Sequence, residues 1–176
     1  MDGVVKIVIT GPESSGKSWL SQRLAQKHNT PWAAEHARTY LEKHGPEYDF
    51  STLRKIARGH KEHQQQIIEQ ARDLVFLDTD LINFKIWSRV VFQKEDPWIN
   101  EQSRQEADHR YLILFPDLPW EKDSLREHPG QRQYLFNCHL EEVAQSKRPY
   151  RIIKGQGEDR FDHALEALNQ LLITKG

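Results

Sequence analysis

A glycine-rich segment near the N-terminus has residue types and a spacing suited to holding a phosphate chain. Residues 11–18 read GPESSGKS and match the pattern G-x-x-x-x-G-K-[ST]. The two glycines let the backbone turn tightly and aim its N–H groups at phosphate oxygens. Lys17 would place a positive charge against the β- and γ-phosphates, and the Ser18 hydroxyl would bind Mg²⁺. The residues predicted to bind ATP are Gly11, Pro12, Glu13, Ser14, Ser15, Gly16, Lys17, Ser18 and Trp19.

Two aspartates end a short apolar run, in the sequence LVFLDTD over residues 74–80. A buried strand would deliver Asp78 to its carboxyl end beside the glycine-rich loop, where Asp78 can bind Mg²⁺ together with Ser18. Asp80 lies two residues further on, so we expect it to reach the acceptor substrate and to be a candidate for catalysis. Aspartate is also common just before helices, so a helix cap is the alternative interpretation.

Residues 116–132 contain three prolines, one glycine and many charges, which predicts an exposed lid beyond a strand. Arg126 and Arg132 lie in this segment. Arginines that close over a transferring phosphoryl group stabilise the charge on its oxygens, and a closed lid excludes water. A solvated charged loop is the alternative.

The sequence WAAEHAR over residues 32–38 follows a weak predicted strand and could contact a small acceptor. In open α/β sheets, ligands bind beyond the carboxyl ends of the strands. Glu35 is a candidate general base for a hydroxyl nucleophile, and Arg38 is a candidate substrate anchor. Whether Glu35 or Asp80 is the base stays open at this point.

The tryptophans are candidates for stacking on a flat ring of the acceptor. Trp32 and Trp120 are predicted to do so, and a cationic ring would gain most from their electron-rich faces. Partial burial in the core is the alternative for both, and Trp87 on a predicted helix is expected in the core.

Some residues with chemical potential are expected to be structural. His60 and His63 lie three apart on a predicted helix, but without a third ligand a solvated helix face is the expectation. Cys138 is expected to be a small buried hydrophobe. Gly155 and Gly157 follow the last predicted strand and are expected to form the loop that backs the adenine.

Apolar periodicity predicts strands that alternate with helices along the whole chain. Strands are predicted over residues 4–10, 31–35, 74–78, 111–115 and 150–153. Helices are predicted over residues 17–27, 37–43, 51–73, 81–92, 131–146 and 159–173, with Ser51 as the N-cap of the longest. This alternation predicts one α/β domain over residues 1–176, a parallel sheet covered by helices on both faces.

The composition excludes several classes of protein. The chain has 25 Lys and Arg against 26 Asp and Glu, whereas general nucleic-acid or membrane-surface binders are normally basic. The apolar run at the N-terminus is too short for a signal peptide or a membrane span. The single cysteine suits a reducing compartment, so a cytoplasmic location is expected. Nothing in the sequence predicts an oligomeric state.

Taken together, the segments GPESSGKS, TPWAAEHARTYLE, IARGH, FLDTD and FPDLPWEKDSLR resemble the ribosylnicotinamide kinase domain of the bifunctional NAD-biosynthesis family. The resemblance runs from about the first strand to the last helix. It implies a P-loop three-layer sandwich with a five-stranded parallel sheet. It also implies transfer of the ATP γ-phosphate to the ribose 5′-hydroxyl of nicotinamide riboside.

The resemblance also implies roles for residues in the matching motifs. Gly16, Lys17 and Ser18 would bind ATP and Mg²⁺, and Asp78 would belong to the metal site. Arg126 would belong to the lid, and Trp32 and Glu35 would lie on the nucleoside side. The chain departs from the family pattern at His36 and Thr39, and it has Trp19 where a small threonine is common. Its first strand begins almost at Met1, so the adenylyltransferase activity of bifunctional members is expected to be absent.

Two other functions remain open from the sequence. One is a regulatory P-loop ATPase that has no small-molecule acceptor. The other is a kinase for another nucleoside or for a nucleoside monophosphate, whose acceptor phosphate would need more arginines in the pocket.

Overall fold

A five-stranded parallel sheet forms the centre of the chain in the computed structural model, which describes residues 3–122 and 129–173. The elements in chain order are β1 (Val5–Thr10), α1 (Lys17–His28), β2 (Trp32–Ala33), α2 (His36–His44), α3 (Phe50–Ile68), β3 (Leu74–Asp78), α4 (Leu81–Phe92), α5 (Pro97–Gln105), β4 (His109–Leu114), a 3₁₀ turn (Pro129–Gln131), α6 (Arg132–Gln145), β5 (Tyr150–Ile153) and α7 (Gly157–Ile173).

The strand order is β2-β3-β1-β4-β5, so β1 is central and is buried on both faces. Its β-branched sequence VKIVIT suits that position, because branched side chains pack well on a pleated, buried surface. Ile9 pairs with Asp78 of β3, and Thr10 pairs with Ile113 of β4. The loops that follow these strands therefore emerge at one edge of the sheet.

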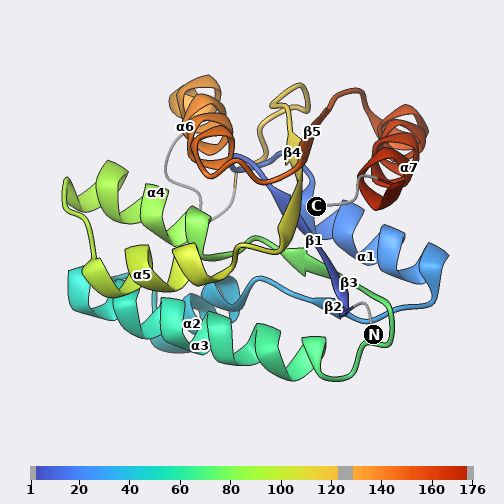
Figure 1. The fold of residues 1–176 in the computed structure, drawn as a ribbon. Helices are drawn as coiled ribbons and strands as arrows, with labels where there is room; N and C mark the ends of the chain where they lie inside the picture. Colours follow the sequence, from blue (N-terminus) through green and yellow to red (C-terminus); the bar gives the residue numbers. More distant parts are fainter. Residues whose placement is uncertain (1–2, 123–128, 174–176) are drawn as a thin grey trace.

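Helices cover both faces of the sheet, which gives three layers (Figure 1). Leu20 and Leu24 of α1 and Leu168 of α7 pack on one face in a single apolar cluster. On the other face, Ile86 of α4 and Phe136 of α6 belong to a second cluster. Helices α2, α3, α4 and α5 enclose a third apolar cluster beside the sheet. The predicted three-layer α/β fold with a five-stranded parallel sheet is confirmed.

Several element boundaries differ from the sequence prediction. The long helix begins at Phe50, and its N-cap is Asp49 rather than Ser51, because the Asp49 carboxylate accepts a hydrogen bond from the Thr52 amide at 2.7 Å. Strand β2 is only Trp32–Ala33. Helix α5 was not predicted, although Asp96 followed by Pro97 is a usual helix start, and Asp96 accepts from the Trp98 and Ile99 amides.

The expectation of a solvated face for His60 is wrong. The His60 ring is fully buried, lies 5.1 Å from the Phe84 ring between centroids, and accepts a hydrogen bond from the His36 amide at 3.4 Å. His63 is partly exposed, as expected. Cys138 is buried and packs in the second cluster, as expected.

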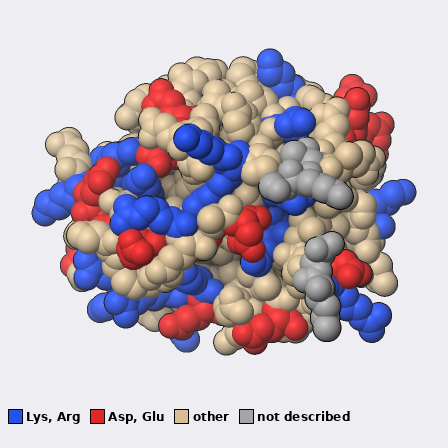
Figure 2. Space-filling model, in the orientation of Figure 1, with Lys and Arg blue, Asp and Glu red and all other residues tan. Residues whose placement is uncertain are grey.

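The surface carries both signs of charge. On the face shown in Figure 2, lysine and arginine side chains are interspersed with aspartate and glutamate. Among the described residues, no helix has the length and apolarity that crossing a membrane requires.

We predict that His60 makes the fold sensitive to acid. Burial lowers the pKa of His60 from 6.5 to about 4, so the unfolded chain takes up a proton before the folded chain does. The contribution to stability is therefore complete above pH 6.5 and is lost as the pH falls toward 4, by about 3 kcal/mol. Urea denaturation across this pH range should show this loss in the wild type and a flatter profile in His60→Gln.

The exposed His44 at the end of α2 provides a matched control. His44→Gln should keep the steep profile of the wild type. If His60→Gln and His44→Gln give the same pH profile, burial of His60 does not cause the acid sensitivity.

Candidate active site

A cavity of about 670 Å³ opens at the carboxyl edge of the sheet. All nine residues of the segment from Gly11 to Trp19 line it. The other walls come from Glu35, from α2, α4 and the loop between α2 and α3, from the segment after β4, from Leu135 and His139 of α6, and from the start of α7. The volume is in the range of small-molecule sites in proteins.

The glycine-rich loop depends on its two glycines. Gly11 has φ of +143° and Gly16 has φ of +83°, which side-chain-bearing residues rarely adopt. A Cβ atom at Gly11 would also lie 2.8 Å from the Leu114 carbonyl oxygen of β4. The Lys17 ammonium donates to the Pro12 carbonyl at 2.9 Å, and the Ser15 hydroxyl donates to the same oxygen at 2.7 Å. These bonds hold the lysine across its own loop.

Asp78 lies beside this loop because its strand is the neighbour of β1. The Ser18 hydroxyl donates to one Asp78 carboxylate oxygen at 2.5 Å. The other oxygen is buried and has no hydrogen-bond partner among the described residues. Burial, and then the nearby charge of Glu35, raise the pKa of Asp78 to about 7. A buried carboxylate oxygen without a donor, next to a hydroxyl, fits a hard cation such as Mg²⁺.

Asp80 does not line the cavity, so its predicted roles in substrate binding and catalysis are wrong. Thr79 has φ of +65°, so the chain turns between the two aspartates and sends them in different directions. Asp80 is fully buried and caps α4 through the Ile82 amide at 3.0 Å. Its second oxygen accepts from Tyr111 at 2.6 Å and contacts His109 Nδ1 at 3.1 Å. The helix-cap alternative is therefore the correct one for Asp80.

The buried network around Asp80 carries its own compensating charge. Arg148 donates to the Tyr111 hydroxyl at 2.7 Å. Burial acts to raise the pKa of Asp80, but the hydrogen bonds from His109 and Tyr111 outweigh it, and the pKa is lowered. Burial raises the pKa of Glu106 to about 7. Asp80, Glu106 and His109 offer atoms within 4.8 Å of one another, but both Asp80 oxygens already accept hydrogen bonds, from the Ile82 amide and the Tyr111 hydroxyl. We interpret this network as structural.

The acceptor candidates after β2 divide into two groups. Glu35 and Arg38 line the cavity, and both charges act on Asp78. Trp32 does not line it, because its ring packs with the α1 and α7 side of the core. Trp120 is half-buried and is also absent from the cavity wall.

Two aromatic residues in the cavity were not predicted to be there. Tyr48 and Trp87 both line it, and the Trp87 indole N–H donates to the Tyr48 hydroxyl at 2.9 Å. Their rings meet edge to face, with centroids 5.0 Å apart. Trp87 packs against the third core cluster, as expected, and also faces the cavity. Helix α2 ends at His44, and Tyr48 lies four residues later in the loop. This loop position is the only sequence signal that Tyr48 could line the cavity.

The two predicted lid arginines have different outcomes. Arg126 lies outside the described residues. The Arg132 guanidinium donates to the backbone carbonyls of Ser14, Pro116 and Leu118, at 3.2, 3.3 and 2.6 Å. Arg132 does not line the cavity. In this structure it connects the glycine-rich loop to the segment after β4.

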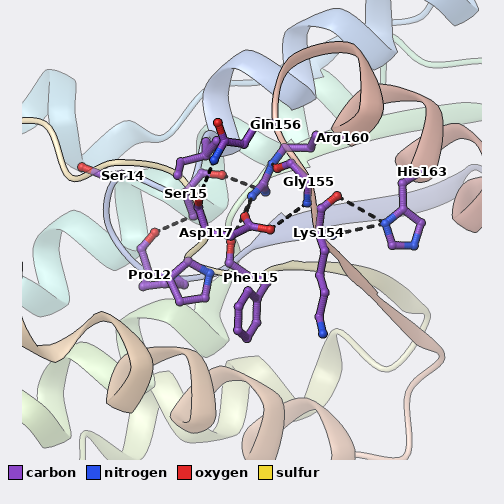
Figure 3. A network of polar contacts seen from close by, with 12 residues as sticks. Pro12, Ser14, Ser15, Phe115, Asp117, Lys154, Gly155, Gln156, Arg160 and His163 are labelled. Carbon is purple, nitrogen blue, oxygen red and sulfur yellow. Dashed lines mark hydrogen bonds and ion pairs between the residues drawn. The ribbon is translucent and has the colours of Figure 1, made fainter.

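Arg160 is the most connected buried charge at this edge of the sheet (Figure 3). Its side chain is fully buried and donates to the carbonyls of Ser15 at 3.1 Å, Phe115 at 3.0 Å and Gly155 at 2.8 Å. It also forms an ion pair with Asp117. One side chain therefore joins the loops that follow β1, β4 and β5.

Asp117 and Gly155 complete this network. Asp117 accepts from the Gly155 amide at 2.7 Å, and Gly155 has φ of +97°. Gly157, which was predicted to back the adenine together with Gly155, lines the cavity. Asp117 and Arg160 were missed in the sequence, where the aspartate after FP and the arginine after KGQGED read as ordinary surface charges.

His139 is a further cavity residue that sequence reasoning missed. It lies on α6, is buried, and its Nδ1 is 3.0 Å from the Thr10 hydroxyl. Burial, and then the charge of Lys17, lower the pKa of His139 to about 3. The ring is therefore neutral near pH 7 and adds no positive charge to the phosphate side.

Comparison with known proteins identifies the family of this chain and proteins of similar sequence and fold. The sequence profile described as "AAA domain" matches residues 6–160. The chain belongs to the AAA domain family. This AAA domain is also 27% identical over 177 residues to the trifunctional NAD biosynthesis/regulator protein NadR of Salmonella typhimurium, a match that covers 97% of this chain and 43% of that protein. It thus spans less than half the length of the curated relative.

Solved structures show the same fold. A NadR protein in complex with NR superposes with a TM-score of 0.84 at 21% identity, over 98% of this chain and 52% of the other. Thymidylate kinase from Ehrlichia chaffeensis superposes with a TM-score of 0.66 at 17% identity, over 96% of this chain and 99% of the other. The AAA domain described here therefore has the P-loop kinase fold, and this fold is similar to that of the NadR protein.

We predict that Arg160→Met destabilises the protein by about 3–5 kcal/mol, because it removes the ion-pair partner of Asp117 and the donor to three carbonyls. Thermal and urea unfolding would measure this loss. Arg104→Met removes an exposed arginine that pairs with Glu101, and it should cost less than about 1 kcal/mol. Equal losses in the two variants would contradict the role assigned to Arg160.

Proposed function

We propose that this domain is an ATP-dependent small-molecule kinase that phosphorylates the ribose 5′-hydroxyl of nicotinamide riboside and yields nicotinamide mononucleotide. The observation that carries the proposal is one cavity that joins the glycine-rich loop to Glu35 and to the aromatic pair Tyr48 and Trp87. The NadR-like sequence and fold support the same substrate class.

The donor side of the cavity consists of the glycine-rich loop, the start of α1 and the start of α7. Loop N–H groups and the positive end of α1 would bind the phosphates of ATP. Lys17 would exchange the Pro12 carbonyl for phosphate oxygens. Asp78 and Ser18 would hold Mg²⁺, which when bound neutralises the charge of the β- and γ-phosphates.

The acceptor side consists of Glu35 together with residues of α2, α4 and the loop between α2 and α3. Tyr48 and Trp87 offer electron-rich aromatic surface, which favours a flat ring and favours a cationic ring most. A pyridinium ring such as that of nicotinamide riboside has this character. In this proposal Tyr48 and Trp87, rather than Trp32 and Trp120, stack on the ring of the acceptor.

Glu35 is the general base in this proposal, since Asp80 lies outside the cavity. The Glu35 carboxylate takes the proton of the 5′-hydroxyl, and the oxygen forms a bond to the γ-phosphorus of ATP. The bond from that phosphorus to the β–γ bridging oxygen breaks, and ADP leaves with the electron pair. Arg38 beside Glu35 would orient the ribose hydroxyls.

The residues of the cavity wall favour a nucleoside over a nucleoside monophosphate. A phosphate on the acceptor would need paired arginines. Among the described residues that line the cavity, the arginines are Arg38 and Arg160, and Arg160 is held on the donor side by backbone carbonyls and Asp117. A regulatory ATPase without an acceptor would have no use for the carboxylate and the aromatic pair.

The proposal is tested with MgATP and a panel of acceptors: nicotinamide riboside, neutral nucleosides and nucleoside monophosphates. We expect ADP release and a phosphorylated product, seen by mass spectrometry, with nicotinamide riboside giving the highest kcat/KM. If ADP forms equally fast without any acceptor, the regulatory ATPase is the correct function.

We predict that Glu35→Gln lowers kcat about 10²- to 10⁴-fold, because the amide cannot accept the hydroxyl proton. The KM values for both substrates should change little, since the amide keeps the shape of the side chain. Glu47→Gln alters an exposed glutamate outside the cavity wall and should leave kcat unchanged. A Glu35→Gln enzyme with wild-type kcat would exclude Glu35 as the base.

A further inference from the structure

An aromatic surface next to the glycine-rich loop takes no part in the proton and phosphoryl transfers of the proposed function, and how its tryptophan would contact ATP is not yet assigned. This surface consists of Trp19, Arg23 and Phe161, and we call it the Trp19 platform. Trp19 is 41% exposed, although it is a large apolar side chain on the first turn of α1. It also lines the cavity. An exposed tryptophan inside a site calls for an explanation, because burying such a ring would stabilise the fold.

The platform is held in place by its neighbours. The Arg23 guanidinium lies 5.2 Å from the centroid of the Trp19 ring and 4.2 Å from that of Phe161. Arg23 is in turn fixed by Glu158 of α7 at 2.6 Å. The Phe161 ring meets Trp19 edge to face at 6.5 Å between centroids. One side of the indole is therefore occupied, and its orientation is fixed before any ligand binds.

The platform lies on the donor side of the cavity. Trp19 follows Lys17 and Ser18 directly, and Phe161 and Glu158 belong to α7, which lies beside α1 on the same face of the sheet (Figure 1). Gly157, at the start of α7, lines the cavity, and the space around its α-carbon is open. The proposed acceptor groups are on α2 and α4 instead. A phosphate chain on the loop would therefore carry its nucleoside toward either the platform or the acceptor side.

We propose that the exposed indole of Trp19 is the stacking surface for the nucleobase of the phosphate donor. This inference rests on the proposed function, in which the glycine-rich loop binds a nucleoside triphosphate. The ligand class is a nucleotide with any planar base, because stacking uses the face of the base and not its hydrogen-bonding edge.

The platform also predicts how the donor is selected. Base–aromatic stacking contributes a similar free energy for different bases, so Trp19 should favour ATP and GTP alike over a donor that has no base. Discrimination between adenine and guanine would have to come from groups that contact the base edges.

The test is a titration calorimetry measurement with Mg²⁺ and no acceptor, using ATP, GTP and inorganic tripolyphosphate as ligands. Trp19→Ala should weaken the affinity for ATP and for GTP about 5- to 150-fold. Its affinity for tripolyphosphate should stay within about twofold of the wild type, because that ligand presents no base. Trp19→Phe should recover part of the loss.

Intrinsic fluorescence provides a second measurement with a matched control. Trp98 also lies under a guanidinium, that of Arg58 at 4.8 Å from the ring centroid, but it does not line the cavity. ATP should change the emission of the wild type and of Trp98→Phe. The change should be absent or much smaller in Trp19→Phe.

The inference is overturned if Trp19→Ala binds ATP as tightly as the wild type, or if it loses ATP and tripolyphosphate to the same extent, which would indicate a structural role. These outcomes are separate from those of the kinase assay. Suppose that the wild type binds ATP, that Trp19→Ala selectively weakens this binding, and that no nucleoside is phosphorylated. This result would contradict the proposed function but would still support base stacking on Trp19.

Discussion

The pairing of β1 with β3 is the constraint on which the rest of the site depends. Because Ile9 pairs with Asp78, the chain leaves both strands at the same level, and the Thr79 amide closes this junction by donating to the Ile9 carbonyl at 2.9 Å. The glycine-rich loop then begins next to a buried carboxylate. A shift of register by one residue would turn Asp78 to the other face of the sheet and separate it from Ser18.

Sequence reasoning predicted the layered parallel fold correctly, and it located the glycine-rich loop, Asp78 at the end of its strand and Glu35 beside one cavity. The chemical roles of these residues stay predictions. Sequence reasoning was wrong for Asp80, because two residues along an extended strand share a face, and only the left-handed backbone at Thr79 removes this relation. Threonine rarely adopts a left-handed conformation, so Thr79 gave no sequence signal for this turn.

The residues that sequence reasoning missed come from elements that meet only in three dimensions. Tyr48 and Trp87 are 39 positions apart and are joined by a hydrogen bond. Arg160 reaches Ser15 across 145 positions. Arg160 lies in a polar segment and Trp87 on an apolar helix, and neither position carries a sequence signal of function. Their partners depend on how α7 and α4 pack on the sheet, which apolar periodicity does not predict.

The bond from the Lys17 ammonium to the Pro12 carbonyl has a consequence for how the loop is built. The loop supplies its own acceptor for the lysine, and this bond holds the ammonium across the loop. Arrival of an anion then requires an exchange of one oxygen for another rather than the ordering of a long, flexible side chain.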